Sequence, residues 1–129
     1  MTDISQGLAF GAMQFGTTAD ARAAAGMVEA CLAAGLRDFD TAHGYGGGAS
    51  ERMLGDLLRG VEGVRIATKA GYDGGAGRAN LTAQLSESLD RLGMPMDLLY
   101  LHRFDPDTPL DETVATLLGF QAQGLARRI

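Results

Sequence analysis

The chain has one cysteine and no long apolar run among its 129 residues. The single cysteine, Cys31, excludes a disulfide within the chain and is typical of a reducing compartment, so we expect a cytoplasmic protein. Cys31 falls on the apolar side of an expected helix, and we interpret it as a core residue. Residues 1–6 show no basic stretch followed by an apolar run, which predicts neither a signal peptide nor a membrane span.

Positive charge is also scarce. The formal net charge is −5, which removes the usual electrostatic basis for nucleic-acid binding. Apolar residues make up 46% of the chain and charged residues 21%, a balance typical of a globular domain with a real core. We therefore expect neither a nucleic-acid partner nor a membrane partner.

Lysine occurs only at position 69, although lysine and arginine together number 11. Arginine stays protonated in proteins, whereas a buried lysine can lose its proton. The survival of Lys69 in an arginine-using sequence therefore indicates that an amine is needed at this position. The alternative is that nucleotide bias removed the other lysines and spared this one by chance.

Short apolar stretches alternate along the chain with longer segments of helical periodicity. Strands are expected at 8–13, 38–40, 64–69 and 97–102, and a fifth is expected to begin at 127. The expected helix starts are Thr17-Thr18, Ser50, Asn80 and a capping box at 108–111. The last helix is expected to turn Leu110, Val114, Leu117 and Leu118 inward.

Each expected helix ends at a glycine followed by an apolar residue. The glycines are Gly35, Gly60, Gly93 and Gly124, and the pattern predicts left-handed C-caps. The unit repeats about every 30 residues, the size of one strand–helix unit of a parallel sheet. Two α/β architectures satisfy this pattern: an open doubly wound sheet, or part of a (β/α)8 TIM barrel.

In both architectures, function gathers at the carboxyl ends of the strands. Those ends carry a carboxylate at Asp40, an amine at Lys69 and an imidazole at His102. A buried carboxylate needs a partner, and the amine at the next strand end is the obvious one. The glycine-rich turn after Asp40 is expected to aim Tyr45 over the sheet. The alternative assigns these groups no chemistry: a core ion pair, a loop aromatic and a satisfied imidazole.

Two other kinds of site fit the pattern less well. The run 44–49 matches the G-x-G-x-x-A loop of dinucleotide-binding folds, but its first glycine follows the strand too late. The next strand also ends in Lys69, where that fold offers an acid to a ribose. His43 and His102 with Asp40 match no known spacing of metal ligands, so no metal site is predicted.

Several segments together resemble the motifs of the aldo-keto reductase family. Segments 38–46, 66–69 and 97–102 read Asp-Phe-Asp-Thr-Ala-His-Gly-Tyr-Gly, Ile-Ala-Thr-Lys and Asp-Leu-Leu-Tyr-Leu-His. Segment 11–16 resembles the family's first-strand glycine motif, and 124–129 resembles the lead-in to its fifth strand. The resemblance implies a (β/α)8 barrel that uses NADP(H) to reduce carbonyl substrates. Residues 1–129 would then form the N-terminal half of that single barrel domain.

The resemblance also implies roles for four catalytic residues. Tyr45 would be the general acid that protonates the carbonyl oxygen as hydride arrives. Lys69 would make the phenol a better proton donor, and Asp40 would pair with and orient Lys69. His102 would position the carbonyl. A phenol alone is a poor proton donor near neutral pH, and a cation within hydrogen-bond reach improves it.

The implied cofactor and substrate contacts lie nearby. Gly11, Ala12 and Met13 would line the nicotinamide ribose together with Asp40. Arg103, which follows the last motif, would contact substrate or cofactor.

A full barrel needs eight strand–helix units in about 250 residues, and only four and the start of a fifth are expected in this chain. The family's groups for the nicotinamide amide, the stacked aromatic and the 2′-phosphate have no counterpart in its sequence. One explanation is a homodimer of half-barrels. The other, which we favour, is a truncated gene product, because Ile129 falls inside an expected strand.

Three functions remain open at this point. The first is an NADPH-dependent carbonyl reductase, or the catalytic half of one. The second is a regulatory protein of the same fold that senses the cofactor, as the potassium-channel β subunits do. The third is a structural half-barrel without a cofactor.

Overall fold

The structure is a computed structural model in which residues 7–129 are described. The expectations about the start of the chain fall on residues 1–6 and lie outside the described residues. The strands are β1 (Phe10–Gly11), β2 (Asp38–Asp40), β3 (Arg65–Ala70), β4 (Met96–Leu101) and β5 (Ala126–Arg128). The helices are α1 (Ala21–Ala33), α2 (Ala49–Leu58), α3 (Arg78–Leu92) and α4 (Leu110–Ala122), with a 3-10 turn at Tyr45–Gly48.

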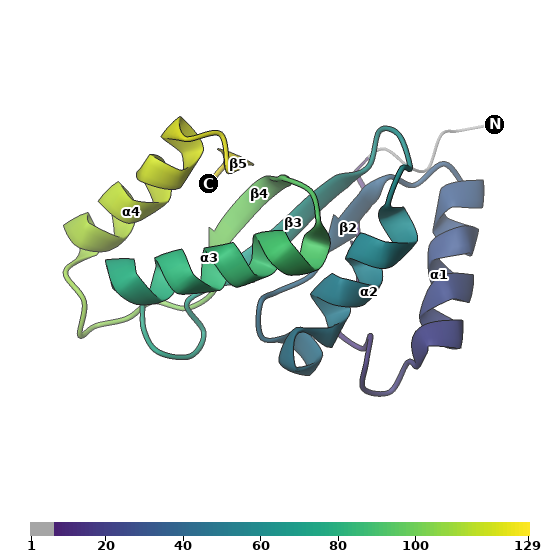
Figure 1. Cartoon of the computed structure of the whole chain (residues 1–129), viewed down its shortest axis with the longest axis horizontal. Coiled ribbons are helices and arrows are strands. Elements are labelled where there is room, and N and C mark those ends of the chain that lie inside the picture. Colours follow the sequence, from purple (N-terminus) through teal and green to yellow (C-terminus); the bar gives the residue numbers. More distant parts are fainter. Residues whose placement is uncertain (1–6) are drawn as a thin grey trace.

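The strand order decides between the two architectures. The strands form one parallel sheet in the order β1-β2-β3-β4-β5. A doubly wound sheet reverses its strand order and so places helices on both faces. In this sheet every connection steps to the next strand, so right-handed crossovers place all the helices on one face. Figure 1 shows α1 to α4 side by side in front of the strands. The fold is therefore a partial (β/α)8 barrel.

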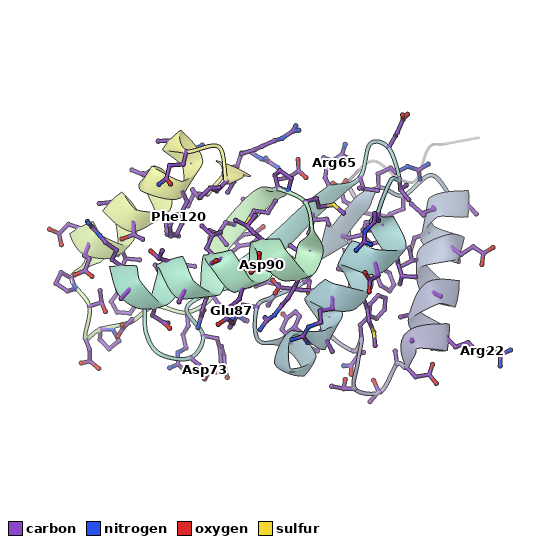
Figure 2. All side chains as sticks on the ribbon, in the orientation of Figure 1. Arg22, Arg65, Asp73, Glu87, Asp90 and Phe120 are labelled. Atoms are coloured by element: carbon purple, nitrogen blue, oxygen red, sulfur yellow. The ribbon has the colours of Figure 1, made fainter. Side chains whose placement is uncertain are left out.

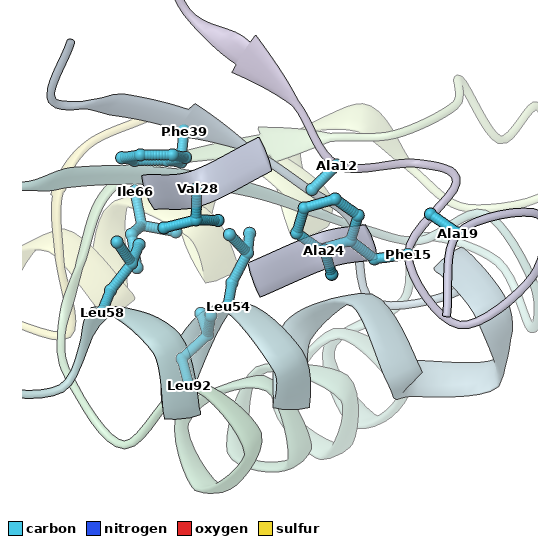
Figure 3. Close-up of a cluster of buried hydrophobic side chains, with 10 residues drawn as sticks. All are labelled: Ala12, Phe15, Ala19, Ala24, Val28, Phe39, Leu54, Leu58, Ile66 and Leu92. Atoms are coloured by element: carbon cyan, nitrogen blue, oxygen red, sulfur yellow. The ribbon is translucent and has the colours of Figure 1, made fainter. Parts of the chain in front are cut away.

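The core lies between this helical layer and the sheet. Residues of β3 alternate: Ile66, Thr68 and Ala70 are buried, whereas Lys69 lies on the other face and is only half-buried. Figure 3 shows Ile66 and Phe39 of the sheet against Leu54 and other apolar side chains of α1 and α2. Full burial of each large apolar side chain contributes roughly 1.5–3 kcal/mol, so this cluster fixes α2 on β2 and β3.

A second apolar cluster joins α3 and α4 to β4 and β5. It includes Leu81, Leu85, Leu99, Leu117 and Phe120. The two clusters together hold the helices against the same side of the sheet. The opposite face, where Lys69 lies, is left to polar and partly exposed side chains.

The predicted glycine C-caps are confirmed for α1, α3 and α4, whereas α2 ends in a turn through the extended residue Arg59, and Gly60 is not its C-cap. Gly35, Gly60, Gly93 and Gly124 all have positive φ, between 66° and 84°. At the end of α3, the backbone N–H of Gly93 donates to the carbonyl of Leu89 at 2.8 Å. A residue with a Cβ is strained in this conformation, so glycine favours the ends of α1, α3 and α4.

The predicted start of α1 is wrong. The hydroxyls of Thr17 and Thr18 donate to the backbone and side-chain oxygens of Gln14. Asp20 is the cap, and its side chain accepts from the backbone N–H of Ala23 at 2.9 Å. Both threonines find a partner within their own turn, so neither is free to cap the helix.

Ser50 is not the predicted cap of α2. The helix begins at Ala49 after Gly48, and Ser50 is buried within it. The Ser50 hydroxyl donates to the carbonyl of Ala12 and shares a 2.7 Å hydrogen bond with the hydroxyl of Thr41. Ser50 therefore ties α2 to the ends of β1 and β2.

The predicted caps of α3 and α4 are also wrong. The Asn80 amide donates to the carbonyls of Asp73 and Gly75, and α3 begins before it. The Thr108 hydroxyl donates to the Asp105 carboxylate at 2.6 Å, and no side chain caps α4. These polar side chains bond to the loops that follow β3 and β4.

Helix α4 also faces differently from the expectation. Leu117 is buried, but Leu110, Val114 and Leu118 are exposed. The buried side is formed by Thr113, Thr116, Leu117 and Phe120. The Thr113 hydroxyl donates to the carbonyl of Ala76 at 2.9 Å. Because this hydrogen bond is made, a polar residue can be buried at position 113.

The contact of α2 with α3 gives a stability prediction. A Cβ added at Gly55 would lie 2.5 Å from the carbonyl oxygen of Arg91 and 2.6 Å from that of Leu92. Because these are backbone atoms of a packed helix, we expect Gly55→Ala to lower the free energy of unfolding by about 1–3 kcal/mol. Urea unfolding of the full-length gene product measures the change.

The matched control is Gly26→Ala in α1. A Cβ at Gly26 meets nothing within 4 Å, so the higher helix propensity of alanine is expected to raise stability by up to about 1 kcal/mol. Equal unfolding free energies for the two variants would contradict the close approach of α2 and α3.

None of the helices within residues 7–129 has the length and apolar character required to span a membrane.

Candidate active site

The carboxyl ends of β2 and β3 bring Asp40 and Lys69 together. Asp40 is paired in register with Ala67, so Lys69 lies one pleat further along on the same face. The Lys69 ammonium donates to Asp40 Oδ2 at 2.6 Å and to the carbonyl of Thr41 at 2.8 Å. The two side chains are 18% and 33% exposed, so the pair is largely withdrawn from water.

The turn after β2 places Tyr45 over this pair. Gly46, Gly47 and Gly48 all have positive φ, so the chain folds back within four residues. A Cβ at Gly46 would lie 2.9 Å from the carbonyl oxygen of Phe15, because the turn presses against the loop after β1. Lys69 Nζ lies 3.3 Å from the Tyr45 hydroxyl and 4.8 Å from the ring centroid.

His102 completes the cluster from β4. Its backbone N–H donates to the carbonyl of Ala70 at 2.7 Å, which extends the β3–β4 ladder past the end of β4. The His102 ring lies edge-on to the Tyr45 ring at 5.9 Å, and its buried Nδ1 has no hydrogen-bond partner within the described residues. The four predicted residues therefore lie at one end of the sheet.

The His102 environment keeps its imidazole neutral near pH 7. Burial, followed by the nearby Lys69 ammonium, lowers the pKa of His102 below its ordinary value of 6.5. A neutral imidazole has one donor and one acceptor nitrogen, so it can donate a hydrogen bond to a carbonyl oxygen.

This lowered pKa predicts a pH dependence of stability. As pH falls below 6.5, the unfolded chain protonates His102 before the folded chain does, so the folded state loses stability in that window. Well above pH 6.5 His102 is neutral in both states and does not change the unfolding free energy. We expect the unfolding free energy of the wild type to fall more steeply with decreasing pH than that of His102→Gln.

Urea unfolding across the pH range measures this difference. Asp38, Glu87 and Asp105 also have lowered pKa values, from ordinary values of 3.8, 4.5 and 3.8, so they act at more acid pH. Parallel curves for the two proteins between pH 6.5 and the carboxylate range would contradict the neutral, desolvated imidazole.

The residues predicted to line a cofactor differ in their placement. Gly11 is the register partner of Asp40, and both Gly11 and Met13 lie on the exposed side of β1's end. Ala12 is fully buried, its N–H donates to the carbonyl of Asp40, and its carbonyl accepts from Ser50. The groups of Ala12 are thus engaged within the protein.

The structure adds Tyr72, which the sequence pattern did not single out. The Tyr72 ring lies 5.0 Å from the His102 ring, and the Arg103 guanidinium lies 5.1 Å from the Tyr72 ring centroid. Arg103 therefore contacts Tyr72, and it takes no part in the ion pair of Asp40 with Lys69. The available signal was the place of Tyr72 in the loop directly after Lys69's strand.

Comparisons with known proteins identify the family. The model of the aldo/keto reductase family matches residues 7–129. "Aflatoxin B1 aldehyde reductase member 2" of Rattus norvegicus is 40% identical over 125 residues, covering 92% of this chain and 34% of that protein. A "probable voltage-gated potassium channel subunit beta" of Oryza sativa is 33% identical over 131 residues, covering 92% and 40%.

A solved structure shares the fold as well. The crystal structure of an aldo-keto reductase from Klebsiella pneumoniae in complex with NADPH superposes with a TM-score of 0.83 at 31% identity. The match covers 93% of this chain and 43% of that one. The chain thus spans about a third to two-fifths of the length of these curated relatives. On the family match and the shared fold, the chain belongs to the aldo-keto reductase family.

Proposed function

We propose that residues 1–129 form the N-terminal part of one barrel domain and carry the catalytic groups of an NADPH-dependent carbonyl reductase. The observation that carries the proposal is the contact of one ammonium with both a carboxylate and a phenol. Lys69 Nζ lies 2.6 Å from Asp40 Oδ2 and 3.3 Å from the Tyr45 hydroxyl. The substrate class is an aldehyde or ketone, and the product is the alcohol.

The described residues fit the reacting end of the cofactor. The Asp40 side chain stays 33% exposed beside Lys69, so its carboxylate can still accept a ribose hydroxyl. Next to it, no residue other than the chain neighbours of Gly11 has a heavy atom within 4 Å of the position that a Cβ would take on Gly11. Gly11, Met13 and Asp40 would therefore hold the nicotinamide ribose. When bound there, NADPH supplies the hydride.

Tyr45 supplies the proton in this proposal. As the carbonyl carbon gains a hydride, its oxygen becomes negative and takes the proton of the Tyr45 hydroxyl. The electron pair of the broken O–H bond stays on the phenol oxygen. The Lys69 ammonium faces that oxygen and stabilises the phenolate. Oxidation of the alcohol reverses the same transfers.

Asp40 and His102 set the geometry. Asp40 neutralises Lys69 and holds it in one direction, because the ammonium is fixed between Asp40 Oδ2 and a backbone carbonyl. His102 is neutral and lies beside the Tyr45 ring, where it can orient the carbonyl oxygen toward the phenol.

Turnover with a simple aldehyde tests the proposal. The full-length gene product is incubated with NADPH and nitrobenzaldehyde, and the consumption of NADPH is followed by absorbance. NADPH binding is measured separately by fluorescence titration. The proposal predicts both binding and turnover. Absence of turnover at saturating NADPH and aldehyde would contradict it.

A regulatory role is the second candidate, and the match to the rice channel-subunit protein favours it. In that case the protein binds NADPH without consuming it at an appreciable rate. Absence of both binding and turnover would instead support a structural half-barrel. A homodimer that closes the barrel also stays a prediction, and size-exclusion chromatography at low concentration tests it.

A further inference from the structure

A second ionic cluster lies on the helix side of the sheet, behind the candidate active site. Glu51 of α2 is fully buried. Its Oε1 accepts from the Thr68 hydroxyl at 2.6 Å, and its Oε2 accepts from Arg91 Nη1 at 3.2 Å. The Arg91 side chain of α3 is only 15% exposed. A buried carboxylate–guanidinium pair is costly to assemble, and the proposed chemistry makes no direct use of it.

Arg91 also bonds to the turn that carries Tyr45. Its Nη1 donates to the carbonyl of His43 at 2.9 Å, and its Nη2 lies 3.2 Å from Glu87. Glu87, which projects from α3 (Figure 2), also bonds to His43 Nε2 at 2.6 Å. The hydrogen bond from His43 holds the pKa of Glu87 below its ordinary value, so Glu87 is a carboxylate at neutral pH. Both the backbone and the side chain of His43 are thus tied to α3.

The far end of the same turn rests on the Arg91 guanidinium. A Cβ at Gly48 would lie 2.5 Å from Arg91 Cζ and 2.7 Å from Nε. Gly48 has a φ of 96°, which favours glycine independently of this contact. Arg91 therefore contacts the Tyr45 turn both before and after the tyrosine. These contacts leave the turn no room to move toward α3.

Glu51 joins this arrangement to the strand that carries the amine. Thr68, its hydrogen-bond partner, directly precedes Lys69 on β3. One buried carboxylate thus links β3 to the arginine that holds the turn of Tyr45. The hydroxyl and the ammonium come from different elements, and their 3.3 Å separation depends on how those elements are fixed. Catalytic contacts need supporting hydrogen bonds to stay within about 0.5 Å of the working geometry.

We propose that Arg91, oriented by Glu51, is a positioning residue that sets the Tyr45 hydroxyl against Lys69. The inference rests on the proposed reductase function. A guanidinium suits the task because one planar group bonds a carbonyl and two carboxylates while lying close against Gly48. Arg91→Lys keeps the charge but loses this geometry.

The test compares kcat for nitrobenzaldehyde reduction in the full-length gene product with that of Arg91→Lys and Glu51→Gln. A displaced phenol is expected to lower kcat by roughly 10- to 100-fold. The dissociation constant of NADPH is expected to stay within a few-fold of the wild type, because no cofactor contact changes. Arg59→Lys is the matched control. Arg59 pairs with Asp56 on the exposed end of α2, with side chains 74% and 72% exposed, so its kcat should not change.

A background without the phenol separates positioning from a general structural role. If Arg91 acts through Tyr45, Arg91→Lys should have no further effect on the residual rate of Tyr45→Phe. An equal fold-loss in both backgrounds would overturn the inference, as would an unchanged kcat in Arg91→Lys and Glu51→Gln. Loss of the folded state in both variants, seen by circular dichroism, would also overturn it, because the pair would then serve the fold. Absence of turnover in the wild type would instead overturn the proposed function, and this inference with it.

Discussion

Tyr45→Phe is expected to lower kcat for carbonyl reduction by about 10²- to 10⁴-fold, the range for loss of a positioned general acid. The substitution removes only the hydroxyl that lies 3.3 Å from Lys69 Nζ and leaves the ring against His102. We therefore expect NADPH binding to be retained. Steady-state kinetics with nitrobenzaldehyde and a fluorescence titration of NADPH measure the two quantities.

Tyr100→Phe is the matched control for this experiment. Tyr100 lies on β4 as the register partner of Lys69, the residue is 45% exposed, and the substitution again removes a single hydroxyl. We expect its kcat to stay close to that of the wild type. A protein in which Tyr100→Phe abolishes turnover and Tyr45→Phe does not would contradict the assignment of the acid.

Lys69→Arg is expected to have the second large effect, a loss of about 100-fold or more in kcat. Three oxygens converge on the single nitrogen of Lys69, those of Asp40, Thr41 and Tyr45, at 2.6, 2.8 and 3.3 Å. A guanidinium is larger and spreads its donors over a plane, so it cannot occupy this space and reach all three oxygens. The fold is expected to survive, because Asp40 keeps a cationic partner.

Arg65→Lys provides the opposite exchange on the same strand. Arg65 binds Asp38 through two hydrogen bonds of 2.6 Å at the other end of β3, and its side chain is 55% exposed. Exposed pairs contribute little, so kcat is expected to stay near the wild-type value. Wild-type kcat in Lys69→Arg would show that turnover does not depend on the amine.

Much of the fold was predictable because its signals are local. The strand predicted at 38–40 has the observed bounds of β2, and the other predicted strands lie within a few residues of theirs. The glycines after each helix, Gly93 among them, marked the helix ends, because left-handed backbone geometry strongly favours that residue. The helix starts were not predictable in the same way. Ser50 and Asn80 resemble caps in the sequence. In the structure Ser50 instead bonds to the distant loop after β1, and Asn80 bonds to carbonyls of the loop that precedes its own helix.

The candidate site likewise has a part that the sequence predicts and a part that it does not. Asp40, Lys69 and His102 end successive parallel strands, so their meeting followed from the strand pattern alone. Glu51 and Arg91 are 40 residues apart on neighbouring helices, and no spacing rule connects them. Their pairing depends on how α2 crosses α3, including the close approach at Gly55, which only the packed structure supplies.

The most direct test of the account is whether the phenol and the amine act as one unit. The measurement is kcat of the full-length gene product with nitrobenzaldehyde for Tyr45→Phe, Lys69→Arg and the double variant. When two residues serve one function, the second substitution has nothing further to remove. We therefore expect kcat of the double variant to be no lower than that of Tyr45→Phe alone. A double variant whose loss equals the product of the two single losses would show that the Tyr45 hydroxyl and the Lys69 ammonium act independently, and would contradict the account.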